Sequence, residues 1–301
     1  AAIQFNREIA IYSALFFAFS PLNLMYQSAV LFDISSVFFA LLAYWMGAKY
    51  IQGKRSKALF FIFLLAGLYS VLTKPLYFLP AGVLFITHFL QQFTRPRIKN
   101  FLDYIVIHRL IIGIFVLITF VMFFWLSLQT LINSAFLMID SVGRPVPHNS
   151  LGFLSYQHLY DAMFYIRTLF RGILLILNPV TFLFFIFGIL LLYKNHRGSE
   201  RMALIYSIIW YHVIFGTQID PHEYYELIMV PFASIIAGSG ASWISEKMRS
   251  EFEITSRHML SAAIILAAAL CSFFLYSINF IGNLSLEHRT YSISQEIRDL
   301  L

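Results

Sequence analysis

Acidic, aromatic and imidazole side chains crowd into the stretch QIDPHEYYELIMVPFASIIAG, residues 218–238, just before an uncharged apolar run. Glu226 follows Glu223 by three residues and His222 by four, so these side chains fall on neighbouring faces of one helix. His222 and Glu226 could hold a divalent cation, although two ligands without a third do not define a metal site. Acidic residues in a first helical turn also complement the helix dipole, so capping and cation binding both stay open.

Three more residues of this stretch have polar side chains that could take part in a site. Asp220, followed by Pro221, predicts a turn and the entry to a helix. Tyr224 and Tyr225 are typical of the aromatic belt at a membrane surface. We therefore expect the whole stretch at the mouth of a helix that enters the membrane.

Two further charges stand at the ends of apolar runs. Asp33 opens DISSVFFALLAYW, where it could cap the helix or line a polar cavity and orient a substrate or a metal. Lys74 lies in a short turn between two apolar helices and is followed by Pro75. Its ammonium could extend to lipid headgroups, or it could bind a lipid phosphate whose oxygens lose water near the interface.

Three arginines add cations on the same predicted side. Arg144 lies in the long connection 130–170, while Arg167 and Arg171 belong to DAMFYIRTLFRG, which predicts an amphipathic helix on the membrane surface. For each arginine, contact with lipid headgroups and a place in a phosphate site both stay open.

Helices in a membrane must position these residues. The 301 residues are 59% hydrophobic and 12% charged, with a mean hydropathy of +0.75. A water-soluble domain of this composition would have too little polar surface to stay in solution. Long apolar runs rich in phenylalanine favour a helical bundle over an outer-membrane barrel, which needs alternating ten-residue segments. We predict an all-α, polytopic transmembrane helical bundle.

The charge pattern limits the kinds of partner that the chain can have, and its cysteine content limits the covalent cross-links. The net charge of +6 comes from short basic clusters between the apolar runs. The positive-inside rule accounts for such clusters, so we exclude a nucleic-acid partner and expect membrane lipids instead. The single cysteine, Cys271, lies within an apolar run, which leaves no disulfide framework.

The sequence contains about nine apolar segments. They lie near residues 9–31, 34–50, 58–73, 75–91, 109–129, 171–193, 202–217, 223–241 and 258–281. Pro21 interrupts the first segment, and we predict a short helix over residues 22–32. Small residues recur at four-residue spacing from Ala233 to Ala241, which predicts close helix packing.

Basic clusters fall at alternate ends of successive segments, which predicts that they face the cytoplasm. The connections at Asp33, 72–80, 130–170 and 217–222 then face outward. Residues 1–281 would form one membrane core, and residues 282–301 the start of an extracytoplasmic segment. We expect both ends of the chain to be incomplete.

Two sequence blocks resemble a known family. FSPLNLMYQSAVLFDISSVFFALLAYWMGAKY, followed by a basic loop and LFFIFLLAGLYSVLTKPLYFLPAG, resembles the membrane core of bacterial glycosyltransferases of the dolichyl-phosphate-mannose-protein mannosyltransferase type. This type includes the aminoarabinose transferases of lipid A. HEYYELIMVPFASIIAG resembles the H-x-Y-Y…P…A-G segment found late in these enzymes. The resemblance covers about residues 9–245 and lies in order and spacing, not in an invariant string.

The resemblance implies a GT-C fold that moves a sugar from a polyprenyl phosphate to an acceptor hydroxyl on a lipid, glycan or protein. The reaction would take place at the outer face of a membrane, for which we expect a bacterial inner membrane with the active face toward the periplasm or exterior. Lys74 is the first candidate to stabilise the charge that develops on the lipid phosphate, with Arg144 or Arg167 assisting.

The family's first outer loop carries the acid that takes the hydroxyl proton, and this chain begins after that loop. Asp33 matches the family's second acidic position and is the candidate catalytic residue within this chain; it would organise the acceptor, a metal or the first-loop acid. His222, Glu223 and Tyr225 match the late motif, which borders the cavity, and we place Tyr224 and Asp220 with them. A divalent cation is a possible cofactor.

Two other functions stay open, as does the role of a purely structural membrane subunit. A lipid or polysaccharide transporter or flippase would need broken helices paired between related halves of the chain, and the sequence has no such internal symmetry. An O-antigen polymerase or ligase would use a large outer loop rich in arginine and histidine, which Arg144, His148, His158 and Arg167 could supply.

Overall fold

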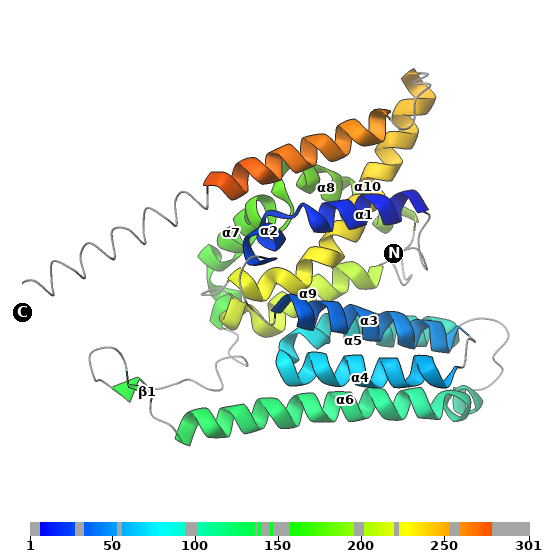
Figure 1. Ribbon diagram of the computed structural model, residues 1–301, viewed down its shortest axis with the longest axis vertical. Coiled ribbons are helices and arrows are strands. Elements are labelled where there is room, and N and C mark those ends of the chain that lie inside the picture. Colours follow the sequence, from blue (N-terminus) through cyan, green and yellow to red (C-terminus); the bar gives the residue numbers. More distant parts are fainter. Residues whose placement is uncertain are drawn as a thin grey trace, which may run out of the picture. The chain divides into compact units, whose positions relative to one another are not determined.

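The computed structural model is helical in nearly all of the residues that it describes (Figure 1). The described residues are 7–27, 33–52, 56–93, 101–135, 138–139, 145–146, 157–195, 202–219, 223–252 and 259–278. A two-residue antiparallel pair, β1 (Met138–Ile139) with β2 (Pro145–Val146), is the only sheet within them. The predicted all-α class is confirmed.

The helices follow the apolar runs of the sequence closely. In chain order they are α1 (Arg7–Ala18), α2 (Pro21–Gln27), α3 (Asp33–Ile51), α4 (Lys57–Thr73), α5 (Pro75–Phe93), α6 (Phe101–Ala135), the 3-10 helix η2 (Gln157–Tyr160), α7 (Ala162–Arg171), the π-helix η3 (Gly172–Ile176), α8 (Asn178–Asn195), α9 (Met202–Ile219), the 3-10 helix η4 (Glu223–Ile228) and α10 (Met229–Phe252). A further helix covers Met259–Ile278. α1 ends before Pro21, which begins α2, so the predicted interruption at this proline is confirmed.

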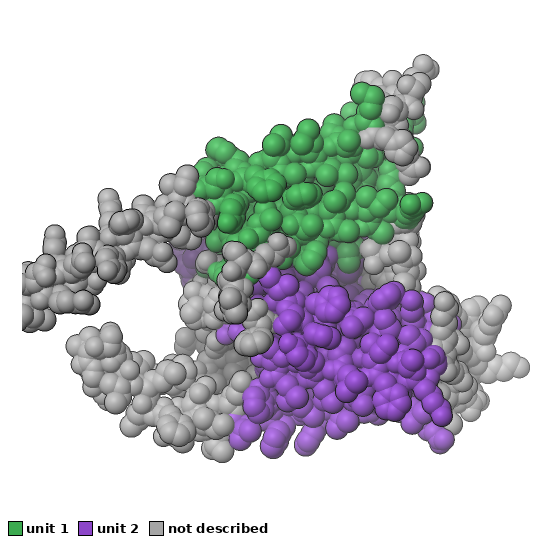
Figure 2. Space-filling model, viewed as in Figure 1, with its two compact units in different colours: residues 1–30, 169–188, 233–301 green, residues 31–168, 189–232 purple. Residues whose placement is uncertain are grey.

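The chain divides into two compact units, which Figure 2 colours separately. Unit 1 comprises residues 1–30, 169–188 and 233–301, and unit 2 comprises residues 31–168 and 189–232. Nothing in this division tests the predicted single core over residues 1–281, and residues 282–301 lie outside the described part of the chain.

Unit 2 is built on α3, α4, α5 and α6, which pack side by side (Figure 1). Stacked aromatic rings fill the space between them: the ring of Phe85 lies 5.3 Å from that of Phe63 and 5.0 Å from that of Phe115. Gly47 allows this packing, because a Cβ atom there would come within 2.8 Å of Phe85. α9 packs against α5, and η4 contacts α3, α5 and α9, so the ends of several helices meet in this unit.

In unit 1, small residues let helices approach closely. Ala237 and Ala241 of α10 are fully buried in one apolar cluster with Tyr12 of α1. A Cβ atom on Gly238 would overlap the hydroxyl of Ser13 in α1. The predicted role of the small-residue stripe in helix packing is therefore confirmed.

Four helices are long and apolar enough to cross a membrane: Asp33–Ile51, His108–Trp125, Tyr225–Glu251 and Met259–Ile278. The bent pair Ala162–Ile176 and Asn178–Lys194 would make a fifth span if it counts as one, and three shorter apolar helices cover Lys57–Thr73, Pro75–Leu90 and Met202–Gly216. The chain is a membrane protein with an all-α bundle, while the predicted number of about nine segments stays a prediction.

The predicted segment 171–193 is not one straight helix. It is interrupted at Leu177, and the helices on either side are bent by 111°. Asn178 adopts a left-handed conformation, with φ of 61°, which asparagine tolerates better than most residues. Its position before Pro179 disfavours a continuous α-helix, because the proline ring crowds the preceding residue.

Candidate functional site

Polar side chains from several helix ends come together in unit 2. Asp33 is the first residue of α3, Lys74 is the single residue between α4 and α5, and Tyr225 lies in η4. Pro75 explains the break at Lys74, because a residue before proline is pushed out of the helical region and proline suits the first position of a new helix. The sequence predicted these three positions on one side of the membrane, and the structure brings them into contact.

Asp33 and Lys74 form an ion pair across two of these helix ends. The Lys74 Nζ lies 3.3 Å from the Asp33 Oδ1, and the two side chains are 29% and 1% exposed. The Tyr77 hydroxyl donates a hydrogen bond of 2.6 Å to the same carboxylate oxygen. A buried carboxylate is costly unless it is both paired and hydrogen-bonded. The lysine and the tyrosine meet both needs.

An aromatic ring covers the lysine from a third element. The Lys74 Nζ lies 5.2 Å from the centre of the Tyr225 ring, within the range of a cation–π contact. The Tyr211 hydroxyl of α9 donates a 2.9 Å hydrogen bond to the backbone carbonyl of Tyr225, which fixes η4 against α9. We call Asp33, Lys74, Tyr77, Tyr211 and Tyr225 the Lys74 cluster.

Glu226 is the acid of the quoted stretch whose side chain the structure describes, and it is buried. Its side chain is 0% exposed, and the His212 Nε2 of α9 lies 3.8 Å from its Oε1. The His212 Nδ1 lies 2.9 Å from the carbonyl of Ile208 one turn earlier, which orients the ring along its own helix. Glu226 therefore faces α9, next to the Lys74 cluster, instead of a solvent-exposed helix mouth.

Helix length sets the depth of the Lys74 cluster in a bilayer. α4 has 17 residues, about 26 Å of helix, whereas the hydrocarbon core of a membrane is roughly 30 Å thick. Lys57 begins α4, and Lys49 lies in the last turn of α3 over the ring of Trp45, so basic residues mark the opposite end of these helices. If these basic residues lie at one interface, Lys74 lies just beneath the headgroups of the other.

Arg167 and His158 are engaged in local structure near α7. The Arg167 Nη2 binds the Asp161 Oδ2 at 3.0 Å, and the Asp161 Oδ1 accepts the backbone N–H of Met163 at 2.9 Å. His158 is buried, its Nε2 lies 3.2 Å from the carbonyl of Val213, and its ring packs where Gly216 leaves room. Neither geometry tests a role in phosphate binding.

Several predicted site residues lie outside the described part of the chain. These are Arg144, His148, Asp220 and His222. For Glu223 and Tyr224 the structure describes the backbone, which is the start of η4, and not the side chains. Within the described residues no three histidine, cysteine or carboxylate side chains gather as metal ligands. The cation proposed for His222 and Glu226 thus stays a prediction.

Sequence reasoning missed three residues of this region: Tyr77, Tyr211 and His212. Tyr77 follows Lys74 by three residues, and its N–H bonds to the Lys74 carbonyl at 3.0 Å, so helical spacing could have indicated it. Tyr211 and His212 belong to a helix far along the chain from Asp33 and Lys74. No local pattern marks them.

The resemblance to membrane glycosyltransferases rests on the order and spacing of sequence blocks. No protein-family model, curated protein or solved structure matches this chain. A functional assignment therefore depends on the geometry of the Lys74 cluster and is made as a proposal.

Proposed function

We propose that the Lys74 cluster binds the phosphate of a polyprenyl-phosphate sugar and that the protein transfers this sugar to an acceptor hydroxyl at the outer membrane face. One observation carries the proposal: the Lys74 ammonium, partly exposed, is held 3.3 Å from a buried carboxylate at a junction of helix ends. The sequence resemblance supplies the reaction, and the bilayer depth of the junction agrees with a lipid phosphate as ligand.

The chemistry follows from where charge develops. When the bond between the sugar and the phosphate breaks, negative charge grows on the phosphate oxygens, and a cation that is already in place stabilises it without reorganisation. Asp33 and the ring of Tyr225 contact the ammonium, and the Tyr77 hydroxyl fixes the Asp33 carboxylate. An ammonium has three donors, so it can contact Asp33 and a phosphate oxygen together.

Asp33 keeps a second role in this proposal. Its carboxylate is 1% exposed and bound by Lys74 and Tyr77, so it orients the cation directly. In the family that the sequence resembles, a different acid, in a first outer loop, takes the hydroxyl proton. Asp33 is accordingly a positioning residue for phosphate binding and, through it, for the acceptor.

The test is a transfer assay with full-length protein in liposomes and a radiolabelled polyprenyl-phosphate sugar. The decisive variant is the double substitution Asp33→Asn with Lys74→Gln, which removes the cation and leaves no unpaired buried charge. We expect transfer to fall at least about a hundredfold, since one preorganised donor is worth that much in related charge-stabilising sites. Arg109→Gln, which removes an exposed cation from α6, is the matched control and keeps full transfer.

Normal transfer by the double variant would refute the role of Lys74. An unchanged elution profile of the detergent-solubilised double variant verifies that it is folded. An equal loss of transfer in Arg109→Gln would also contradict the proposal, because the loss would then not depend on the Lys74 cluster.

A transporter or flippase is the second candidate, favoured by one feature. The pair Ala162–Ile176 and Asn178–Lys194 is bent by 111°, and discontinuous helices of this kind surround the binding sites of many transporters. In the same liposomes, label that crosses the bilayer without chemical change would favour this candidate over sugar transfer.

A further inference from the structure

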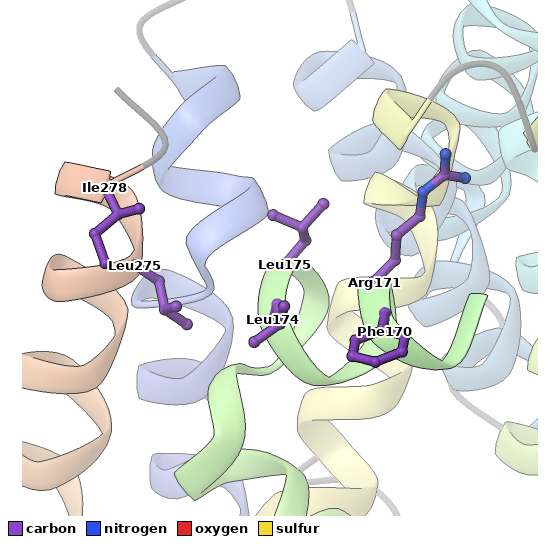
Figure 3. A pocket seen from close by; sticks show the side chains of 6 residues that line it. All are labelled: Phe170, Arg171, Leu174, Leu175, Leu275 and Ile278. Carbon is purple, nitrogen blue, oxygen red and sulfur yellow. The ribbon is translucent and has the colours of Figure 1, made fainter. Parts of the chain in front are cut away.

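A pocket of about 320 Å³ lies in unit 1, where the π-helix η3 meets the helix Met259–Ile278. Its lining residues are Phe170, Arg171, Leu174, Leu175, Leu275 and Ile278 (Figure 3). Five of the six side chains are apolar, the sixth is a cation, and none is a carboxylate. The volume falls at the lower end of the roughly 300–1,000 Å³ typical of ligand sites.

Hydrogen bonds fix the two walls of the pocket relative to each other. The Asn178 Nδ2, just after the π-helix, donates to the Ser272 Oγ at 2.7 Å and to the Ala268 carbonyl at 3.2 Å. These bonds tie the bend to the helix that carries Leu275 and Ile278. A π-helical turn within a longer helix is frequently found at functional sites.

The charged and the apolar side chains of the pocket lie in different places. In Figure 3, Leu174 and Leu175 lie between the helix that carries Leu275 and Ile278 and the turn that carries Arg171. The guanidinium of Arg171 extends away from Leu174. The pocket therefore offers an apolar stretch next to one positive group, which is the pattern of an amphipathic anion.

The bend also indicates the depth of the pocket in a bilayer. Met163, Ile166 and Phe170 present an exposed apolar face of α7, and Arg167 and Arg171 lie on the adjacent face, as in a helix that rests in the interface. α8 is apolar and turns away from it by 111°, as a span would. Arg171, in the last turn of α7, then lies at the level of lipid phosphates.

We propose that this pocket binds one anionic phospholipid of the surrounding membrane. Its phosphate contacts the Arg171 guanidinium, whose fork of donors suits phosphate oxygens, and one acyl chain lies along Leu174, Leu175, Leu275 and Ile278. A net negative headgroup is preferred over a zwitterionic one, because the lining carries one positive charge and no negative charge. None of the lining residues belongs to the Lys74 cluster, and the proposal does not depend on sugar transfer.

The experiment uses full-length protein in phosphatidylcholine vesicles that contain a minor share of phosphatidylglycerol with a photoreactive diazirine in its acyl chain. After illumination, mass spectrometry of peptides locates the labelled residues. In the wild type we expect label on Leu275, Ile278 and their neighbours. Arg171→Gln lowers this label about tenfold, because one charge-assisted hydrogen bond to the phosphate is lost. Arg171→Lys retains most of the label.

Two further variants keep the test decisive. Leu275→Trp fills the pocket without changing its charge and abolishes the label, while Arg109→Gln on α6, which does not line the pocket, changes nothing. Equal labelling of wild type and Arg171→Gln, or equal labelling by photoreactive phosphatidylcholine, would overturn the proposal. Displacement of the label by polyprenyl phosphate and not by unlabelled phosphatidylglycerol would overturn it too, since the pocket would then belong to the donor lipid.

Discussion

Two ion pairs in unit 2 each join a basic side chain to an aspartate and differ in their surroundings. Lys74 pairs with Asp33 at the helix junction, where the acid is 1% exposed, whereas Arg167 pairs with Asp161 at the start of α7, where the acid is 45% exposed. Both cations were predicted as phosphate ligands from residue type and position. Burial of the acid, and not the presence of a cation alone, therefore distinguishes a preorganised site from an ordinary surface ion pair.

The energetics of the two pairs follow from this difference. An exposed pair gains little, because water already solvates both charges and holding two side chains together costs entropy. A buried carboxylate has exchanged water for protein partners, so the loss of one partner leaves an uncompensated charge. The same substitution should therefore have a large effect in the Lys74 cluster and a small one in α7.

The largest effect is expected from Lys74→Met. Because it leaves the Asp33 carboxylate buried and held only by Tyr77, we expect it to lower the free energy of unfolding by about 3–5 kcal/mol. Denaturant titration of the detergent-solubilised protein measures this loss. Adding Asp33→Asn should restore part of the stability, and a double variant less stable than Lys74→Met would contradict the assignment of a buried charged pair.

Tyr77→Phe should have the next largest effect. It removes a 2.6 Å hydrogen bond to a carboxylate and keeps the ring in place, which predicts a loss of about 1.5–3 kcal/mol. The same titration tests it. In an Asp33→Asn background the loss should shrink, since the acceptor no longer carries charge; an unchanged loss would mean that the hydroxyl acts elsewhere.

Tyr211→Phe should cost less, because the lost bond joins two neutral groups, a hydroxyl and the Tyr225 carbonyl. We expect about 1 kcal/mol. The more specific readout is local: hydrogen exchange of η4 should speed up, while exchange within α3 and α4 stays as it was. Uniform acceleration across unit 2 would instead indicate a general loss of packing.

Arg167→Gln is expected to have the smallest effect, within about 1 kcal/mol of the wild type, because both side chains are partly exposed to water. Asp161→Ala should cost more than this, since Asp161 also accepts the N–H of Met163 at the start of α7. A loss for Arg167→Gln as large as that for Lys74→Met would break the comparison between the two pairs.

The sequence was a good guide to helices and a partial guide to the site. Apolar runs marked nearly every helix, and Pro21 and Pro75 marked two of the boundaries, because proline acts on the backbone locally. The break at Asn178 was missed although the pair Asn178–Pro179 is itself a breaker of helices. The long apolar run on both sides of this pair favours a continuous helix, and the two signals conflict.

Within the site, the sequence predicts which helix end each charged residue occupies, but not which residues pair with one another. Asp33 and Lys74 were both placed at outward helix ends, but 41 residues separate them in the sequence, and only the packing of α3 against α4 and α5 brings them together. The burial of Glu226 against His212 has the same origin. Side-chain pairs that form between distant helices leave no local pattern to read.

The left-handed residue Asn178 has a consequence for how the protein is made. Its amide donates to Ser272, which the ribosome adds 94 residues later, and to Ala268, which follows by 90. The bend between η3 and α8 can therefore gain these two hydrogen bonds only after residue 272 has been added to the chain.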